Sequence, residues 1–178
     1  MDAIKLLKKD HREVDAMFKE IHALSDSASA SRRKLFDRIA DALELHTRVE
    51  EEILYPAVKD ASRRDKEARQ EVLEAYEEHD NVKSMIEKLR ETDPKDETYK
   101  AKLQVLEELV KHHVKEEERE FFPEARELLG DDEIDALGDR IAEIKAQAGQ
   151  PVAEPPSVGT RIKRAITGDT NSRRKTER

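Results

Sequence analysis

The sequence predicts an all-α protein: a four-helix bundle with a short additional C-terminal helix and a disordered tail. Charged residues make up 43% of the chain and aromatic residues only 4%, whereas strands favour β-branched and aromatic residues. Five glycines and six prolines among 178 residues leave long stretches without a helix breaker. Within those stretches, apolar residues recur with the 3.6-residue period of an amphipathic helix.

Four long helices are expected in order along the chain. Asp93-Pro94 is interpreted as an N-cap followed by proline at the first helical position. Gly130 is predicted to end the fourth helix from a C′ position. We expect the four helices at about 2–24, 32–60, 66–91 and from Asp93 to about 129, and the short additional helix at about 131–148. This organisation predicts a bundle domain over 1–149 and a disordered basic tail over 150–178.

Composition excludes several classes of function. The chain has no cysteine, which excludes disulfides and thiolate metal sites. The opening residues contain no apolar signal-peptide core, and no apolar run approaches the roughly 20 residues that span a bilayer. We therefore expect a cytoplasmic protein without a membrane span.

The formal charge of −8 is unevenly distributed along the chain. Residues 151–178 hold seven of the 34 basic residues and three of the 42 acidic ones, which leaves 27 basic and 39 acidic residues before them. An acidic body argues against nucleic-acid binding by the folded domain. The basic tail is expected to contact an acidic partner only weakly.

Histidine and glutamate interrupt the apolar stripe of every predicted bundle helix. A buried, unpaired charge costs several kcal/mol, against a total stability of about 5–15 kcal/mol, so these residues need a strong common partner. Imidazole nitrogen and carboxylate oxygen are natural ligands of divalent and trivalent metals. The inward polar positions are His11, His46, Glu50, His79, His113 and Glu117.

An internal repeat places these residues in register. The segments 46–56 and 113–123 both read H-x3-E-x5-P, with an aromatic residue before the proline. The i, i+4 spacing puts each His–Glu pair on one helical face. One ion is expected to take His11 and His46 and a second His79 and His113, with the two glutamates between them.

The whole pattern resembles the hemerythrin-like, or HHE cation-binding, family over about residues 4–129. The resemblance implies an up-down-up-down four-helix bundle that holds a non-heme centre of two iron ions with an oxo or hydroxo bridge. It also implies that the ligands are the six residues named above. Oxygen-carrying members have an additional histidine one turn from the third; here Ala75 and Lys83 occupy those positions, and the last carboxylate is Glu117 in HxxxE rather than an aspartate in HxxxxD. One iron should therefore have a more open or a differently filled coordination sphere, which argues against simple oxygen carriage.

Several other polar and aromatic residues lie near the motifs. His22 and His112 are interpreted as surface residues, and Tyr55 as packing at the end of the bundle. Tyr76, one turn before His79, is predicted either as a core aromatic or as a residue that hydrogen-bonds a bound ligand or coordinates iron. A solvated acidic face is expected to contain Glu51, Glu52, Glu116 and Glu118, with an extra metal ligand among them as the alternative.

Three functions remain open at the level of sequence. The first is redox chemistry on small species such as peroxide, nitric oxide or O2. The open coordination expected at one iron favours it, because catalysis needs a vacant metal position. The second is non-catalytic binding, sensing or storage of iron or oxygen. The third is a metal-free structural or partner-binding bundle. No nucleotide-binding loop is present in the sequence, and a large organic substrate is not expected.

Overall fold

A computed structural model describes residues 1–63 and 65–149, and over this range the chain is helical without any strand. The predicted all-α fold is confirmed, while the predicted tail lies outside the described residues. The elements are α1 (Ala3–His22), α2 (Ser29–Val49), η1 (Glu50–Leu54), α3 (Tyr55–Ala61), α4 (Lys66–Arg90), α5 (Glu97–Glu116), η2 (Glu117–Phe121) and α6 (Phe122–Gln147). The two η elements are single π-helical turns.

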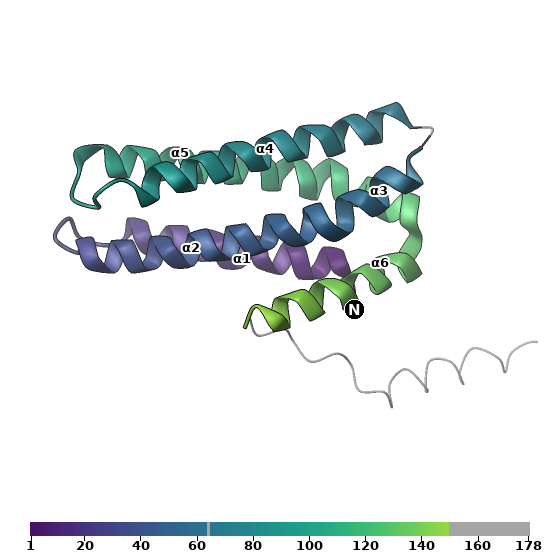
Figure 1. Ribbon diagram of the computed structural model, residues 1–178, viewed down its shortest axis with the longest axis horizontal. Helices are drawn as coiled ribbons and strands as arrows, with labels where there is room; N and C mark the ends of the chain where they lie inside the picture. Colours follow the sequence, from purple (N-terminus) through teal and green to yellow (C-terminus); the bar gives the residue numbers. More distant parts are fainter. Residues whose placement is uncertain (64, 150–178) are drawn as a thin grey trace, which may run out of the picture.

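Four helical rods form the bundle (Figure 1). The first is α1, the second runs without interruption through α2, η1 and α3, the third is α4, and the fourth runs through α5 and η2 into α6. Successive rods run in opposite directions, as expected. Beyond the bundle, α6 turns and lies along α1, near the N-terminus (Figure 1).

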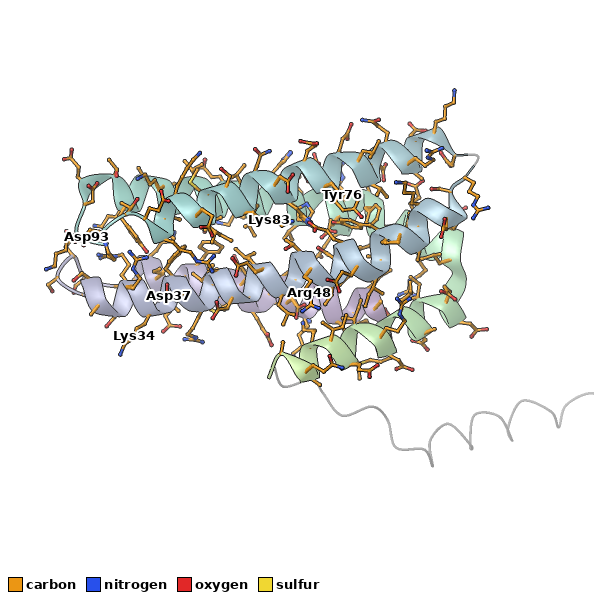
Figure 2. The ribbon with its side chains drawn as sticks, in the orientation of Figure 1. Lys34, Asp37, Arg48, Tyr76, Lys83 and Asp93 are labelled. Atoms are coloured by element: carbon orange, nitrogen blue, oxygen red, sulfur yellow. The ribbon has the colours of Figure 1, made fainter. Side chains whose placement is uncertain are left out.

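Aspartates begin three of these rods. The side chains of Asp2, Asp65 and Asp96 accept hydrogen bonds from backbone N–H groups in the first turns of α1, α4 and α5. The prediction that Asp93 caps the fourth helix was therefore wrong. Asp93 lies in the turn at the end of the bundle (Figure 2), where it accepts from the Lys95 N–H. An Asp-Pro pair suits a turn as well as a helix start, and the structure uses it for the turn.

The predicted break at Gly130 is confirmed. Its φ of 76° and ψ of 166° interrupt the helical conformation within α6, and glycine adopts such a positive φ without the penalty that a Cβ brings. The chain thereby changes direction. The second part of α6 packs on the bundle through Ile134, Leu137 and Ile141, which are nearly inaccessible to solvent.

Gly138 permits this close packing, since a Cβ there would lie 1.9 Å from the carbonyl oxygen of Met1. The N-terminal amino group also donates to Asp139 at 2.8 Å. None of the described helices is long and apolar enough to cross a membrane.

The apolar core has two parts. Phe18, Phe36 and Leu106 belong to the part near the α1–α2 and α4–α5 turns. Leu7 and Phe122 belong to the other, which α6 completes. Between them, at mid-length of the helices, lie buried polar residues: His11, His46, Glu50, His79, His113 and Glu117. The fold thus encloses a polar layer between two apolar ones.

Candidate metal centre

The two π-helical turns begin at the glutamates of the repeated motif. In η1 the backbone N–H of Tyr55 donates to the carbonyl of Glu50, and in η2 that of Phe122 donates to the carbonyl of Glu117. A proline follows each aromatic residue, and proline inside a helix lacks an N–H and clashes with the carbonyl four residues earlier. A turn widened by one residue accommodates it, and such turns are frequent at functional sites. The widening also brings the residue five positions after each glutamate onto the glutamate's face.

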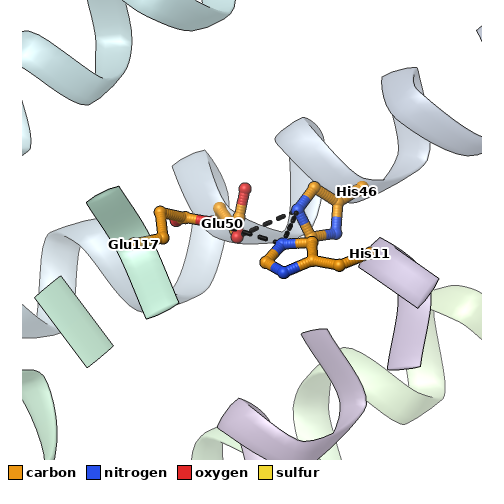
Figure 3. A group of neighbouring side chains, drawn as sticks. All are labelled: His11, His46, Glu50 and Glu117. Carbon is orange, nitrogen blue, oxygen red and sulfur yellow. Dashed lines mark hydrogen bonds and ion pairs between the residues drawn. The ribbon is translucent and has the colours of Figure 1, made fainter. Parts of the chain in front are cut away.

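The four inward histidines form two close pairs. The Nε2 atoms of His11 and His46 are 3.1 Å apart, as are those of His79 and His113. Figure 3 shows the first pair converging with Glu50 and Glu117. The structure thus brings together all six residues that the sequence singled out, in the pairing that the spacing predicted.

Each of these imidazoles is oriented by a carboxylate at its outer nitrogen. The Nδ1 atoms of His11, His79 and His113 lie 2.8 Å from carboxylate oxygens of Glu118, Glu51 and Glu78. His46 Nδ1 lies 3.3 Å from Asp10. Ionised carboxylates only accept, so each Nδ1 carries the proton. In the neutral rings the Nε2 lone pairs therefore face one another, an arrangement that needs a cation between them.

These four carboxylates were missed as site residues. Glu51 and Glu118 were expected on a solvated acidic face, but the structure turns them towards His79 and His11. The repeat contained the signal, because Asp10 and Glu78 precede equivalent histidines and Glu51 and Glu118 follow equivalent glutamates. Second-sphere carboxylates of this kind fix the ring orientation and the basicity of histidine ligands.

The two central glutamates each face both histidine pairs. One oxygen of Glu50 is 3.2 Å from His46 Nε2 and the other is 3.4 Å from His79 Nε2. The Oε2 atom of Glu117 is 3.3 Å from His11 Nε2 and 3.4 Å from His113 Nε2. Both side chains are buried, and these oxygens accept no hydrogen bond within the described part of the chain. A carboxylate that spans two sets of nitrogen donors is placed to bridge two metal ions.

The geometry fits a pair of transition-metal ions. Two nitrogens bound to one ion at about 2.1 Å and at right angles are about 3.0 Å apart, close to the spacing within each histidine pair. The ligand atoms form one group with His11, His46, Glu50 and Glu117 and another with Glu50, His79 and His113, each within 4.8 Å. Imidazole with carboxylate suits iron among other first-row metals.

The match to a family model covers residues 2–125 and is described as the hemerythrin HHE cation binding domain. The chain belongs to the hemerythrin HHE family. A crystal structure of an HHE protein from Mycobacterium kansasii, a homologue of Rv2633c, superposes with a TM-score of 0.72 at 24% identity and covers 94% of each chain. That likeness supports the fold.

Two further relatives are similar to this chain at 25% identity. Rv2633c of Mycobacterium tuberculosis is 25% identical over 154 residues, 85% of this chain and 91% of that protein. A protein of Nostoc sp. named DNA nickase is 25% identical over 150 residues, or 84% of this chain. The chain spans only 41% of the nickase's length.

Protons compensate the buried charge when this HHE centre holds no metal. Burial opposes the charged imidazolium, yet Glu50 and Asp10 raise the pKa of His46 to about 10. Glu117 and Glu78 similarly raise the pKa of His113 to about 9 against the effect of burial. Because metal ligands must lose these protons, metal binding here releases protons.

Tyr55 places a hydroxyl group at the centre. Tyr55 is fully buried, and its hydroxyl donates to Glu117 Oε1 at 3.1 Å and lies 3.2 Å from His79 Nε2. The Tyr76 hydroxyl instead donates to the backbone carbonyl of Glu51 at 3.3 Å. The expectation that Tyr55 only packs the bundle end was wrong, because the π turn rotates Tyr55 inward. Tyr76 packs partly buried against the apolar core, with its ring 5.3 Å from that of Tyr55, which agrees with the core-aromatic alternative.

The aromatic rings at the centre follow the repeat, but one hydroxyl does not. Tyr55 stacks on His79 with ring centroids 5.4 Å apart, and Phe122 stacks on His11 at 5.8 Å. Burial raises the pKa of the Tyr55 phenol well above its usual value, with Glu117 adding to the effect. Tyr55 is therefore a neutral hydrogen-bond donor present on one side of the HHE centre only.

The remaining polar residues lie outside the centre. His112 is 61% exposed, in agreement with its surface assignment. His22 is 39% exposed and contacts Glu107 at 2.7 Å. Glu52 and Glu116 are exposed as expected.

Proposed function

We propose that this HHE protein binds two non-heme iron ions and uses them for redox chemistry on small oxygen or nitrogen species, with peroxide, nitric oxide and O2 as candidates. One observation carries the proposal: four histidine Nε2 atoms converge in two 3.1 Å pairs on two buried glutamates that each face both pairs. Carboxylates shared between two imidazole pairs suit a bridged pair of ions better than two independent sites.

One of the two proposed ion positions has an open side, which supports catalytic turnover of a small molecule rather than reversible oxygen carriage. The positions one turn from His79 hold Ala75, which supplies no ligand, and Lys83, whose ammonium group pairs with Glu51 at 2.6 Å. Ala75 lines a cavity of about 160 Å³ together with His113 and Glu117. A cavity of that size admits a diatomic molecule or peroxide and excludes a large organic substrate.

The protein's own residues would prepare the centre for such chemistry. Iron, when bound, supplies reversible one-electron oxidation and reduction and a Lewis acid for a small oxygen or nitrogen species. Asp10, Glu51, Glu78 and Glu118 hold the imidazole rings through Nδ1 and raise their basicity. Tyr55 holds a proton at its hydroxyl oxygen and fixes one oxygen of Glu117.

Iron content with an ultraviolet–visible spectrum tests the metal part of the proposal. We expect two irons per chain and oxo-bridge absorption in the wild type. His113→Ala should lose iron, whereas the matched neighbour His112→Ala should retain it at equilibrium because its exposed side chain lies outside the two inner groups. Absence of bound metal with helicity intact would refute the proposal and favour a structural or partner-binding bundle.

Consumption of hydrogen peroxide, nitric oxide or O2 by the iron-loaded protein tests the redox part. Turnover that disappears in His79→Ala is the expected result. A reversible spectral change without consumption would refute turnover and favour the alternative of a non-catalytic binding, sensing or storage module.

A further inference from the structure

An acidic pocket connects the protein surface with the candidate metal centre. It lies between α4 on one side and α5 and η2 on the other, and among the described residues that line it there is no lysine or arginine. Glutamate carboxylates dominate its walls: Glu71, Glu74, Glu78, Glu116, Glu117 and Glu120. We refer to this cavity as the acidic pocket.

The inner end of the acidic pocket reaches two of the six inward residues. His113 and Glu117 line it. Glu117 is 2% exposed, and its Oε2 atom accepts no hydrogen bond within the described residues. A buried anionic oxygen without a donor, at the inner end of a carboxylate-lined pocket, is a destination for a cation.

The outer end of the acidic pocket carries a second group of donor atoms. His112 Nε2 lies 3.4 Å from an oxygen of Glu78 and 3.3 Å from one of Glu116. These three residues offer ligand atoms within 4.8 Å of one another, on partly exposed side chains. One imidazole with two carboxylates at the surface can hold a hydrated divalent cation weakly.

The carboxylates of the acidic pocket occur in only one half of the internal repeat. With the offset that superposes the ligands, Glu71 and Glu74 correspond to Ala3 and Leu6. Likewise, Glu116 and Glu120 correspond to Val49 and Ile53. The apolar members lie in the core that α6 completes, with the exposure of each at most 9%. On the α4–α5 face the same positions are carboxylates around an open pocket.

Crowding of the carboxylates is evident at Glu71, at the wall of the pocket. Burial and the neighbouring Glu124 and Glu120 raise the pKa of Glu71 to about 7. A passing divalent cation would relieve this repulsion, because like charges at close range are stabilised by a shared counter-ion.

The other described cavity that reaches an inward ligand suits a cation less well. It reaches His11, has a volume of about 250 Å³ and is lined by Arg12, Lys111 and Lys115 as well as two acids. Three cationic side chains around its opening repel a metal ion. The acidic pocket is therefore the electrostatically favoured route among the described cavities that touch a ligand.

We infer that the acidic pocket is the entry route by which a hydrated divalent metal cation reaches the centre, pausing at Glu78, His112 and Glu116 before it transfers to His113 and Glu117. This inference rests on the proposed metal function and adds a path to it. Ions focused by a cleft of one sign bind about 10–1000 times faster than without it, and the gain falls with ionic strength.

Uptake of Co²⁺ by the metal-free, full-length chain tests the route, because Co²⁺ bound by nitrogen and oxygen ligands absorbs visible light. The variant Glu74→Gln/Glu116→Gln/Glu120→Gln removes three charges without touching a histidine Nδ1 partner. The control Glu91→Gln/Glu97→Gln/Glu108→Gln removes the same charge from exposed positions of the α4–α5 hairpin outside the pocket.

At low salt the pocket variant should take up Co²⁺ at least about tenfold more slowly than the wild type, while reaching the same final content. The control should stay within about twofold, and added salt should narrow the difference. Equal rates in the wild type and the pocket variant, or an equal loss in the control, would overturn the route.

A second measurement separates this inference from the proposed function. The variant Glu50→Ala removes a proposed bridging carboxylate that does not line the acidic pocket. When Mn²⁺ is added to this variant, the ring NMR signals of His112 should broaden before those of His22. If the wild type takes up no Co²⁺, the di-metal proposal fails, and broadening at His112 alone would still establish the outer cation site. Absence of selective broadening at His112 would overturn the pocket as a cation site.

Discussion

Tyr55→Phe removes a single hydroxyl from the candidate centre and leaves its ring contacts in place. The Tyr55 ring lies 5.4 Å from those of both His79 and Phe121, and phenylalanine preserves these contacts. Phe122, at the equivalent position of the repeat, already packs on His11 without a hydroxyl. The substitution therefore tests the hydrogen bond to Glu117 Oε1 rather than the packing.

The size of the effect follows from that hydrogen bond. A hydrogen bond to a charged group contributes about 1.5–3 kcal/mol, and the bond here is fully buried. For a domain of this size each kcal/mol corresponds to about 2–4 °C, so the melting temperature of the metal-free protein should fall by about 3–12 °C. If the whole energy of this hydrogen bond is lost in the transition state of peroxide consumption, the rate should fall by about 10–150-fold.

The assay compares iron content, thermal unfolding of the metal-free form and peroxide consumption of the iron-loaded form. We expect Tyr55→Phe to keep two irons per chain, because no inward nitrogen or carboxylate is removed, and to consume peroxide more slowly. Tyr76→Phe is the matched control, since its hydroxyl donates to the backbone carbonyl of Glu51. If the two variants consume peroxide at the same rate, the assignment of Tyr55 to the centre is refuted.

Three further predictions concern the centre and its surroundings. Glu50→Ala or Glu117→Ala should reduce iron content to one ion per chain or fewer, since each carboxylate faces both histidine pairs; retention of two irons would contradict a bridging role. His22→Ala should leave iron content unchanged and cost about 0.5–1.5 kcal/mol in the free energy of unfolding, because Glu107 keeps Lys111 as a partner at 2.7 Å; loss of iron would contradict its assignment outside the site. In the folded metal-free protein the pKa of His46 is raised to about 10 and that of His113 to about 9. Protonation of these imidazoles therefore stabilises the folded state; this contribution is fully present below the unfolded pKa near 6.5 and should be lost as pH rises through 9 and 10. Thermal unfolding between pH 7 and 10 should therefore show falling stability for the metal-free form, and a flat profile would contradict the charge-compensated centre.

The sequence predicted the bundle and the six inward polar residues for a common physical reason. Apolar periodicity reports which face of a helix is buried, and His11 or His46 stands out because a buried polar residue is costly there. The i, i+4 spacing and the repeat then limit which residues can meet. Periodicity and spacing are properties of a single helix, and the repeat shows the same pattern twice. Both can therefore be recognised from the sequence without a structure.

Residues whose role depends on a departure from the ideal helix escaped prediction. An α-helical period places Tyr55 away from Glu50, whereas the π turn brings it onto the same face. Its proline neighbour was visible in the sequence, but the widened turn that accommodates proline was not. Asp93 illustrates the same limit, because an Asp-Pro pair fits both a turn and a helix start.

The sequence by itself determined that this chain forms a helical bundle with four histidines and two glutamates facing inward, because periodicity and the cost of burying charge act along each helix. Only the tertiary structure decided which carboxylates orient the imidazoles, which tyrosine reaches Glu117, and which face of the bundle stays open. Those outcomes depend on contacts between helices and on the docking of α6 over one half of the repeat but not the other. Contacts between segments that are distant in the sequence depend on every helix that takes part, so they cannot be read from the periodicity of any one helix.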